Sequence, residues 1–247
     1  MIDYVERIIA AQTIEDLWSV HCDAMARFGF TRLLYGFTRF RTATSLGNAE
    51  DFLVLTNHDD GYMRPFMENG AYLQAPTVRW ALENSGTMSW RWILDHPEML
   101  SESERRVTEL NRKHGITAGY TISFKDVSIR SKGAIGLIAD EGVSQDTVEK
   151  IWERDGRKIV AMNNVAHLKI TSLPYSSARK TLTQRQRETL EWVGEGKTTQ
   201  DIATIMGLTT ATIEKHLRLA REALGVETTA QAVLKASFQN QIFVVPF

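Results

Sequence analysis

Four cations and two threonines near the C-terminal end are spaced for contacts with nucleic acid. Lys215, Arg218 and Arg221 recur at steps of three along one segment, and Lys197 precedes it. Lysine and arginine bind phosphate or pair with guanine in the major groove, and threonine hydroxyls bind either group. Lys215 or Arg218 suits guanine, and Lys197 suits phosphate. The predicted DNA-binding residues are Lys197, Thr210, Thr212, Lys215, Arg218 and Arg221. The alternative is that these side chains form only a solvated surface.

Two helices joined at a sharp corner are predicted to position these side chains. In "TTQDIATIMGLTTATIEKHLRLAREALG", residues 198–225, Thr198 and Asp201 have capping-box spacing, and Gly207 ends the first short helix. Thr209 or Thr210 then caps a second helix that runs to Gly225. One face of that helix is apolar and must be buried, which turns the cations outward; its residues are Ile213, Leu217, Ala220 and Leu224.

The flanking sequence predicts two further short helices. "LTQRQRETLEWVGEGKT" carries a capping box at Thr183 and Gln186 and ends in two glycines, and "VETTAQAVLKASFQNQIF" begins at Thr228 or Thr229. Four short helices with these corners predict a compact DNA-binding module. The alternative is a helical bundle that binds protein partners and never DNA.

Residues 182–245 resemble the C-terminal helix-turn-helix domain of LuxR-type transcription regulators. The matching blocks, in order, are LTQRQRETL, GKTTQDIA, TTATIEKHL, LGV and TTAQAV. The resemblance implies that Thr210 to Leu224 is the recognition helix, that Thr229 to Phe238 helps to form a homodimer, and that the target is an inverted repeat in double-stranded DNA. Two positions depart from the family pattern, because Gln186 and Glu214 stand where the family usually has Glu and often has Lys.

Length and charge fit a two-domain protein with modest DNA affinity. The chain has 247 residues, 43% of them hydrophobic, and a net charge of -1. Residues 175–247 contain nine Lys plus Arg against seven Asp plus Glu, a balance of +2, and the remainder carries -3. Because this asymmetry is small, we expect weak, salt-dependent non-specific binding and a need for dimerisation.

Several other classes of protein are disfavoured by the sequence. The single cysteine, Cys22, cannot form an internal disulfide and suits a small buried residue. The start "MIDYVERIIA" lacks a signal-peptide core and no apolar run is long enough to span a membrane, so a cytoplasmic location is expected. No catalytic or metal site is predicted, because "GEGKTT" lacks the first glycine of a phosphate loop and "HDD" and "HC" lack further ligands.

The sequence before a predicted linker at 171–181, "TSLPYSSARKT", predicts an α+β domain over residues 1–170. The predicted architecture of this domain is an α/β/α sandwich around an antiparallel sheet of about five strands. An all-α four-helix domain is predicted over 182–247. The predicted helices are 2–11, 14–28, 62–69, 76–84, 101–114 and 144–170, and the predicted strands are 32–40, 51–56, 117–124 and 133–139.

This N-terminal layout is similar to the autoinducer-binding domain of quorum-sensing LuxR-type regulators, in which an acyl-homoserine lactone lies between sheet and helices. The resemblance places the family's Asp-Pro pair on Ala75 and Pro76, its later Trp on Trp90 and its glycine on Gly119. The positions at which the family has polar residues that contact the ligand are occupied here by Tyr62, His58, Phe66 and Gly136. The predicted pocket residues are His58, Tyr62, Phe66, Thr77 and Trp90, with Trp80 and Trp92 as weaker candidates.

The residue at position 75 decides what such a pocket would hold. Without a carboxylate there, the buried amide of a lactone ligand loses its acceptor, at a cost of roughly 1 to 3 kcal/mol. The sequence therefore predicts a regulator with no cofactor whose effector is an acyl-homoserine lactone or, given Ala75 and Tyr62, another lipophilic signal. The alternative is that the aromatic residues only fill a core and that the regulator works without a ligand.

Overall fold

The computed structural model describes residues 1–42, 45–126, 128–175 and 181–244, which form two compact units. The first comprises Met1–Ala11, Glu15–Asn48 and Phe52–Thr171. The second comprises Gln12–Ile14, Ala49–Asp51 and the chain from Ser172 onward. No helix among the described residues is both long and apolar enough to cross a membrane.

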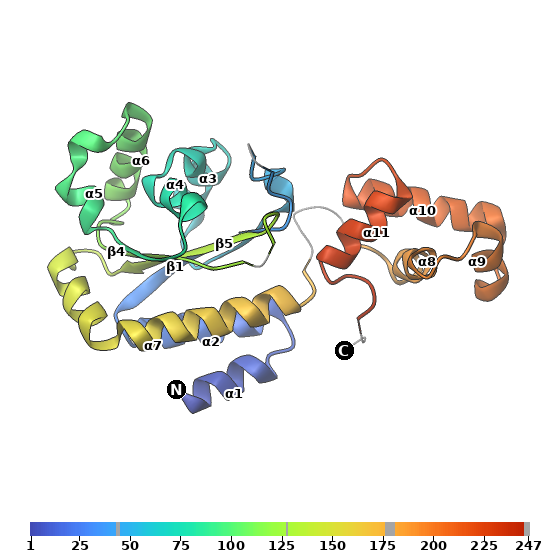
Figure 1. The fold of residues 1–247 in the computed structure, drawn as a ribbon, viewed down its shortest axis with the longest axis horizontal. Helices are drawn as coiled ribbons and strands as arrows, with labels where there is room; N and C mark the ends of the chain where they lie inside the picture. The colour runs from blue at the N-terminus through green and yellow to red at the C-terminus, as the bar shows by residue number, and fades with distance from the viewer. Residues whose placement is uncertain (43–44, 127, 176–180, 245–247) are drawn as a thin grey trace. The chain divides into compact units, whose positions relative to one another are not determined.

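A five-stranded antiparallel sheet forms the centre of the N-terminal unit, in the order β2-β1-β5-β4-β3 (Figure 1). The predicted strand at 32–40 starts and ends two residues earlier, and the edge strand β3 was not predicted. Its four residues contain glycine and are too few for a periodic signal. The strands are β1 (Phe30–Thr38), β2 (Leu53–Thr56), β3 (Gly86–Ser89), β4 (Gly119–Ser123) and β5 (Lys132–Ala139).

Helices cover both faces of this sheet, which confirms the predicted α/β/α sandwich (Figure 1). The long helix α7 (Gln145–Ser172) and α2 (Ile14–Ala26) lie on one face, with α1 (Ile2–Ala10) outside them. The opposite face carries α3 (Asp60–Met67), α4 (Pro76–Glu83), α5 (Arg91–Asp95) and α6 (Glu102–Lys113). Short 3-10 turns occur at Ala49–Asp51, Ala71–Gln74 and Pro97–Met99, and neither these nor α5 was predicted.

A buried polar network ties α1 and α2 to α7. Nε2 of His21 lies 3.1 Å from Oδ1 of Asn163, and Nδ1 lies 2.7 Å from the hydroxyl of Tyr4. Burial lowers the pKa of His21 to about 4, so this ring is neutral near pH 7. Cys22 on the same helix is only partly buried, and burial together with Asp23 raises the pKa of its thiol to about 12, which leaves it unreactive.

Four capped helices form the C-terminal unit, as the sequence predicts. They are α8 (Gln184–Gly194), α9 (Thr199–Met206), α10 (Thr210–Leu224) and α11 (Thr229–Phe238). Thr183, Thr198 and Thr228 each close a capping box, Thr209 caps α10, and Gly207 and Gly225 end their helices in the left-handed conformation. The core of this unit contains the whole predicted apolar face of α10, namely Ile213, Leu217, Ala220 and Leu224.

The described residues of the segment predicted as a linker make contacts within the folded units. Helix α7 continues through Thr171 and Ser172, and residues 176–180 lie outside the described part of the chain. Between them, Tyr175 is buried in the C-terminal unit, where its backbone N–H donates to the carbonyl oxygen of Gln239 at 3.1 Å. Proline and serine composition marks a boundary but does not reveal such contacts with residues far along the chain.

Close approach of β4 to β5 depends on Gly119. A Cβ atom there would overlap the carbonyl oxygen of Leu137 and lie 3.2 Å from the ring of Trp90. The amide N–H of Gly119 also donates to Oε1 of Gln145, at the start of α7, at 2.9 Å. This glycine therefore holds the sheet, α7 and Trp90 in their positions.

We expect Gly119→Ala to destabilise the N-terminal unit by about 1 to 3 kcal/mol or more, because the overlap can be relieved only by moving backbone. Urea unfolding followed by tryptophan fluorescence measures this change. Gly36→Ala is the matched control, since no atom lies within 4 Å of a Cβ built there; it should change stability by less than about 1 kcal/mol. Equal stability of the two variants would contradict the packing role of Gly119.

Candidate functional site

Small residues on one face of the sheet leave space beneath the helices. In one row of paired residues, Leu34 faces Gly136 and Gly136 faces Thr121. In the next row, Gly36 faces Ala134. Because glycine and alanine fill little volume, the helices on this face cannot pack directly onto the strands. A cavity results.

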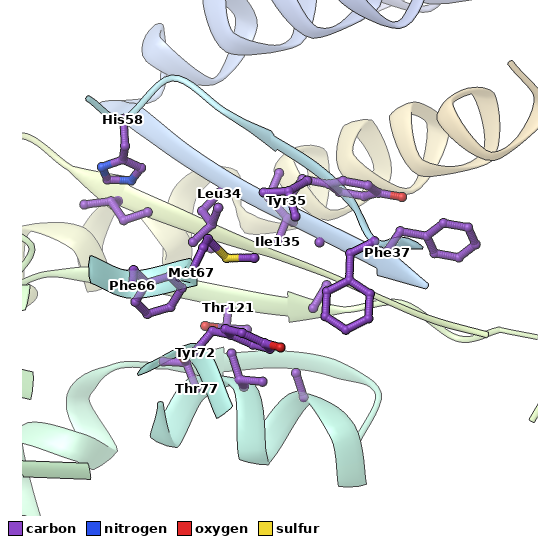
Figure 2. A pocket seen from close by; sticks show the side chains of 18 of the residues that line it. Leu34, Tyr35, Phe37, His58, Phe66, Met67, Tyr72, Thr77, Thr121 and Ile135 are labelled. Carbon is purple, nitrogen blue, oxygen red and sulfur yellow. The ribbon is translucent and has the colours of Figure 1, made fainter. Parts of the chain in front are cut away.

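The cavity has a volume of about 160 Å³. A void of this size takes an apolar group as large as a benzene ring without moving protein atoms. Figure 2 shows Leu34 and Thr121 of the sheet together with Phe66, Tyr72 and Thr77 of the helical layer around the cavity. The lining includes all five predicted pocket residues, His58, Tyr62, Phe66, Thr77 and Trp90.

The polar end of the cavity is formed by His58, Tyr62 and Asn111. The Tyr62 hydroxyl donates to Oδ1 of Asn111 at 3.0 Å, and the rings of His58 and Tyr62 lie 4.9 Å apart between centroids. Arg32 holds the chain after α6 in place, donating to the carbonyl oxygens of His114 and Gly115 at 2.8 and 2.6 Å. Groups from three separate elements thus meet at one place.

His58 is the unusual member of this group. Its Nε2 is fully enclosed but has no hydrogen-bond partner among the described residues. Burial, and to a smaller extent the charge of Arg32, lowers the pKa of His58 to about 4, so the ring is neutral at pH 7. A buried nitrogen without a partner costs stability, and a molecule that enters the cavity can supply the missing hydrogen bond.

Trp90 is held in the cavity wall by a hydrogen bond from its Nε1 to Oγ1 of Thr121, at 2.9 Å. Ala75 is buried in the apolar cluster that contains Trp90 and Phe66. Among the described residues that line the cavity there is no carboxylate, and the charged Lys132 donates to the carbonyl oxygen of Asn84. The cavity therefore suits an uncharged, largely apolar molecule.

Two weaker candidates were wrong. Neither Trp80 nor Trp92 is among the residues that line the cavity. Trp92 is 40% exposed and stacks on His96, and Trp80 is a partly buried residue at the apolar cluster. Conversely, Asn111, Thr121 and Gly36 line it but were not predicted. The alternation of glycine and alanine in "KGAIGLIA" was a usable signal for the empty sheet face; no local signal marks Asn111.

In the C-terminal unit, α10 presents an exposed edge formed by Ala211, Glu214, Lys215, Arg218 and Glu222, which is defined here as the α10 rim. Lys197, at the turn before α9, is exposed as well. Within the rim, Nη1 of Arg218 contacts Oε1 of Glu222 at 2.5 Å. Both groups are more than half exposed, so this ion pair contributes little stability and can open.

Three other predicted DNA-binding residues differ in their surroundings. Thr210 is exposed at the first position of α10. The Thr212 hydroxyl lies 2.9 Å from that of Thr209, within the helix cap. Arg221 is partly buried, and its Nη1 donates to Oγ1 of Thr229 at 2.9 Å. This contact joins α10 to α11.

Comparison with known families identifies both units. Residues 13–170 match the autoinducer binding domain, and residues 180–236 match the bacterial regulatory proteins of the luxR family. The chain belongs to the LuxR-type regulators with an autoinducer-binding domain. Membership of this family confirms the resemblance found in the sequence for both parts of the chain.

Similar proteins span most of this LuxR-type chain. ExpR of Dickeya dadantii is 26% identical over 74% of this chain and 76% of its own length. AnoR of Acinetobacter nosocomialis is 21% identical over 95% of both chains. Both are named as transcriptional activator proteins, which are not enzymes. The structure of SdiA in complex with octanoyl-rac-glycerol is similar in fold, with a TM-score of 0.51 and 14% identity over 95% of this chain and 92% of SdiA.

The two neutral histidines of the N-terminal unit predict a fall in stability with acid. Both have a folded pKa of about 4, below the ordinary value of 6.5, so between these values the unfolded chain binds protons that the folded chain does not. The free energy of unfolding should therefore be highest above pH 6.5 and decline toward pH 4. For His21 alone we expect a loss of about 2 kcal/mol between pH 7 and 5.

Urea unfolding at several pH values measures this dependence. His21→Gln and His58→Gln should each flatten it, whereas the exposed control His96→Gln should retain the full slope. An unchanged slope in the first two variants would contradict the assignment of neutral buried rings.

Proposed function

We propose that the protein is a sequence-specific DNA-binding transcription regulator that acts in the cytoplasm and has no catalytic role. Residues 1–170 would sense a small, largely apolar molecule, residues 171–181 would connect the two parts, and residues 182–247 would bind DNA as a homodimer. The observation that carries this proposal is the exposed α10 rim on a helix whose opposite face is fully buried.

The exposed cations would contact two different parts of the DNA in the proposed complex. Lys215 and Arg218, on the central turns of α10, would contact base edges in the major groove, with guanine as the preferred partner. Lys197 would bind phosphate beside the start of α9, and Thr210 would add a hydroxyl at the start of α10. A dimer would place two such helices on the half-sites of an inverted repeat.

The effector would be an uncharged acyl or ring-bearing molecule. Its apolar part would contact Phe66 and Trp90, and a polar group would pair with Nε2 of His58 beside Tyr62; Thr77 offers a further hydroxyl. Octanoyl-rac-glycerol, bound in the SdiA structure, has this combination of an acyl chain and oxygen acceptors. An effector that binds only the folded protein would raise the population of the active form by mass action.

Two substitutions on the α10 rim test the DNA-binding proposal. Lys215→Ala with Arg218→Ala should weaken binding to the cognate site by about a hundredfold or more, because each lost base contact costs roughly 1 to 3 kcal/mol. Gel retardation with DNA from upstream of the gene, at several salt concentrations, measures the loss. Size-exclusion chromatography should show unchanged dimerisation.

Arg105→Ala with Arg106→Ala on α6 is the matched control, since it removes the same charge from exposed positions of the other unit. Normal operator affinity in the α10 double variant would refute the assignment of the recognition helix.

His58→Phe tests the effector site. In the ligand-free protein this change removes the unpartnered nitrogen and should raise the melting temperature by about 2 to 4 °C, equivalent to about 1 kcal/mol. It should also abolish the thermal shift that octanoyl-rac-glycerol or N-octanoyl-homoserine lactone produces in the unaltered protein.

The exposed control His96→Phe should keep the response to these molecules. A variant at position 58 that responds like the unaltered protein would exclude His58 as a ligand contact. If no lipophilic molecule shifts the unaltered protein, the ligand-independent alternative replaces the sensor proposal.

A further inference from the structure

We propose that Glu214 is a base-reading residue that selects a C·G pair in each half-site of the target DNA. This inference rests on the proposed DNA-binding function and adds a specificity determinant to it. Four observations carry it: the exposure of Glu214, its place among the cations of the α10 rim, the contact that orients it, and the pairing of its cationic neighbour with another acid.

Glu214 lies on the exposed edge of α10 beside Lys215 and one helical turn before Arg218. The N-terminal part of a recognition helix is the part that approaches base edges. A side chain in this position therefore enters the groove together with Lys215 and Arg218. A carboxylate here is repelled by the phosphates, which is unfavourable unless a hydrogen-bond donor on a base pairs with it.

Thr199 orients the carboxylate. Its hydroxyl donates to Oε1 of Glu214 at 3.0 Å, linking the first residue of α9 to α10. The start of α9 is itself fixed by the capping box of Thr198 and Asp201. A carboxylate has about four acceptor sites, so one bond from a hydroxyl leaves capacity for a base.

Arg218 does not neutralise this acid. The two residues are four positions apart on α10, a spacing at which they can pair. Instead, the guanidinium of Arg218 contacts Glu222, one turn further along. Glu214 is thus an oriented, exposed acceptor without an ion-pair partner among the described residues.

The base edges of the major groove allow one good partner for such an acceptor. Cytosine presents the N4 amino donor, whereas guanine presents N7 and O6 and thymine presents O4, all of them acceptors that repel a carboxylate. Adenine has a donor at N6 but an acceptor at N7 beside it. In a C·G pair, the guanine offers its N7 and O6 acceptors to Lys215 or Arg218.

Selection of binding sites from random duplex DNA by the full-length protein tests this inference. The unaltered protein should enrich a site with a fixed C·G pair in each half. Glu214→Gln should weaken the base preference at that position or shift it toward adenine, with which glutamine pairs. The preference for cytosine over the other bases there should fall roughly fivefold to tenfold. Other positions of the site should remain fixed, and affinity for unrelated DNA should stay equal or rise.

Two further variants make the result specific. Thr199→Val should weaken the preference at the same position, because the carboxylate loses its orienting bond. Glu227→Gln removes one exposed acid from the turn between α10 and α11 and should leave every base preference unchanged. Selection is carried out with and without octanoyl-rac-glycerol, and circular dichroism checks that each variant is folded.

The outcomes separate the two proposals. If Glu214→Gln selects the same site with the same discrimination, the base-reading role is overturned while DNA binding stands. If the unaltered protein enriches no sequence under either condition, the proposed function fails, and this inference fails with it.

Discussion

The buried apolar face of α10 determines which of its side chains can reach another molecule. Ile213, Leu217 and Ala220 are fixed in the core of the C-terminal unit, so the helix cannot rotate without exposing them to water. Gly207 ends α9 in the left-handed conformation and sets the corner before α10, and Gly225 ends α10 in the same conformation. The rim of charged residues is the consequence of this packing, and the proposed contact with DNA depends on it.

In the N-terminal unit, packing likewise determines what can be bound, but the feature it produces is a cavity between the sheet and the helices. Small side chains at Gly36, Ala134 and Gly136 keep one sheet face open, while Gly119 allows β4 and β5 to approach closely. At one end of the resulting cavity, His58 keeps a buried nitrogen unpaired. Such a group lowers the stability of the empty protein, and a complementary ligand would restore it.

The small net charge of the chain agrees with an α10 rim that contains both acidic and basic side chains. With a net charge of -1, the chain has little electrostatic attraction for duplex DNA as such. Recognition by such a protein must then depend on a few directional contacts and on dimerisation. In the proposed complex, an oriented acid among cations would serve this purpose, because it would reject most base edges as well as accept a hydrogen bond from one.

The sequence alone determined the features that depend on neighbouring residues. Capping threonines, terminating glycines and the periodic face of α10 act over three or four positions, so the four C-terminal helices could be predicted closely. The hydrophobic pattern of residues 1–170 predicted the sandwich, and the resemblance to LuxR-type regulators added the five pocket residues. Tertiary structure decided the rest, because strand register and contacts between distant elements have no local signature: the short strand β3, the approach of Asn111 to Tyr62, and the bond from Thr199 to Glu214.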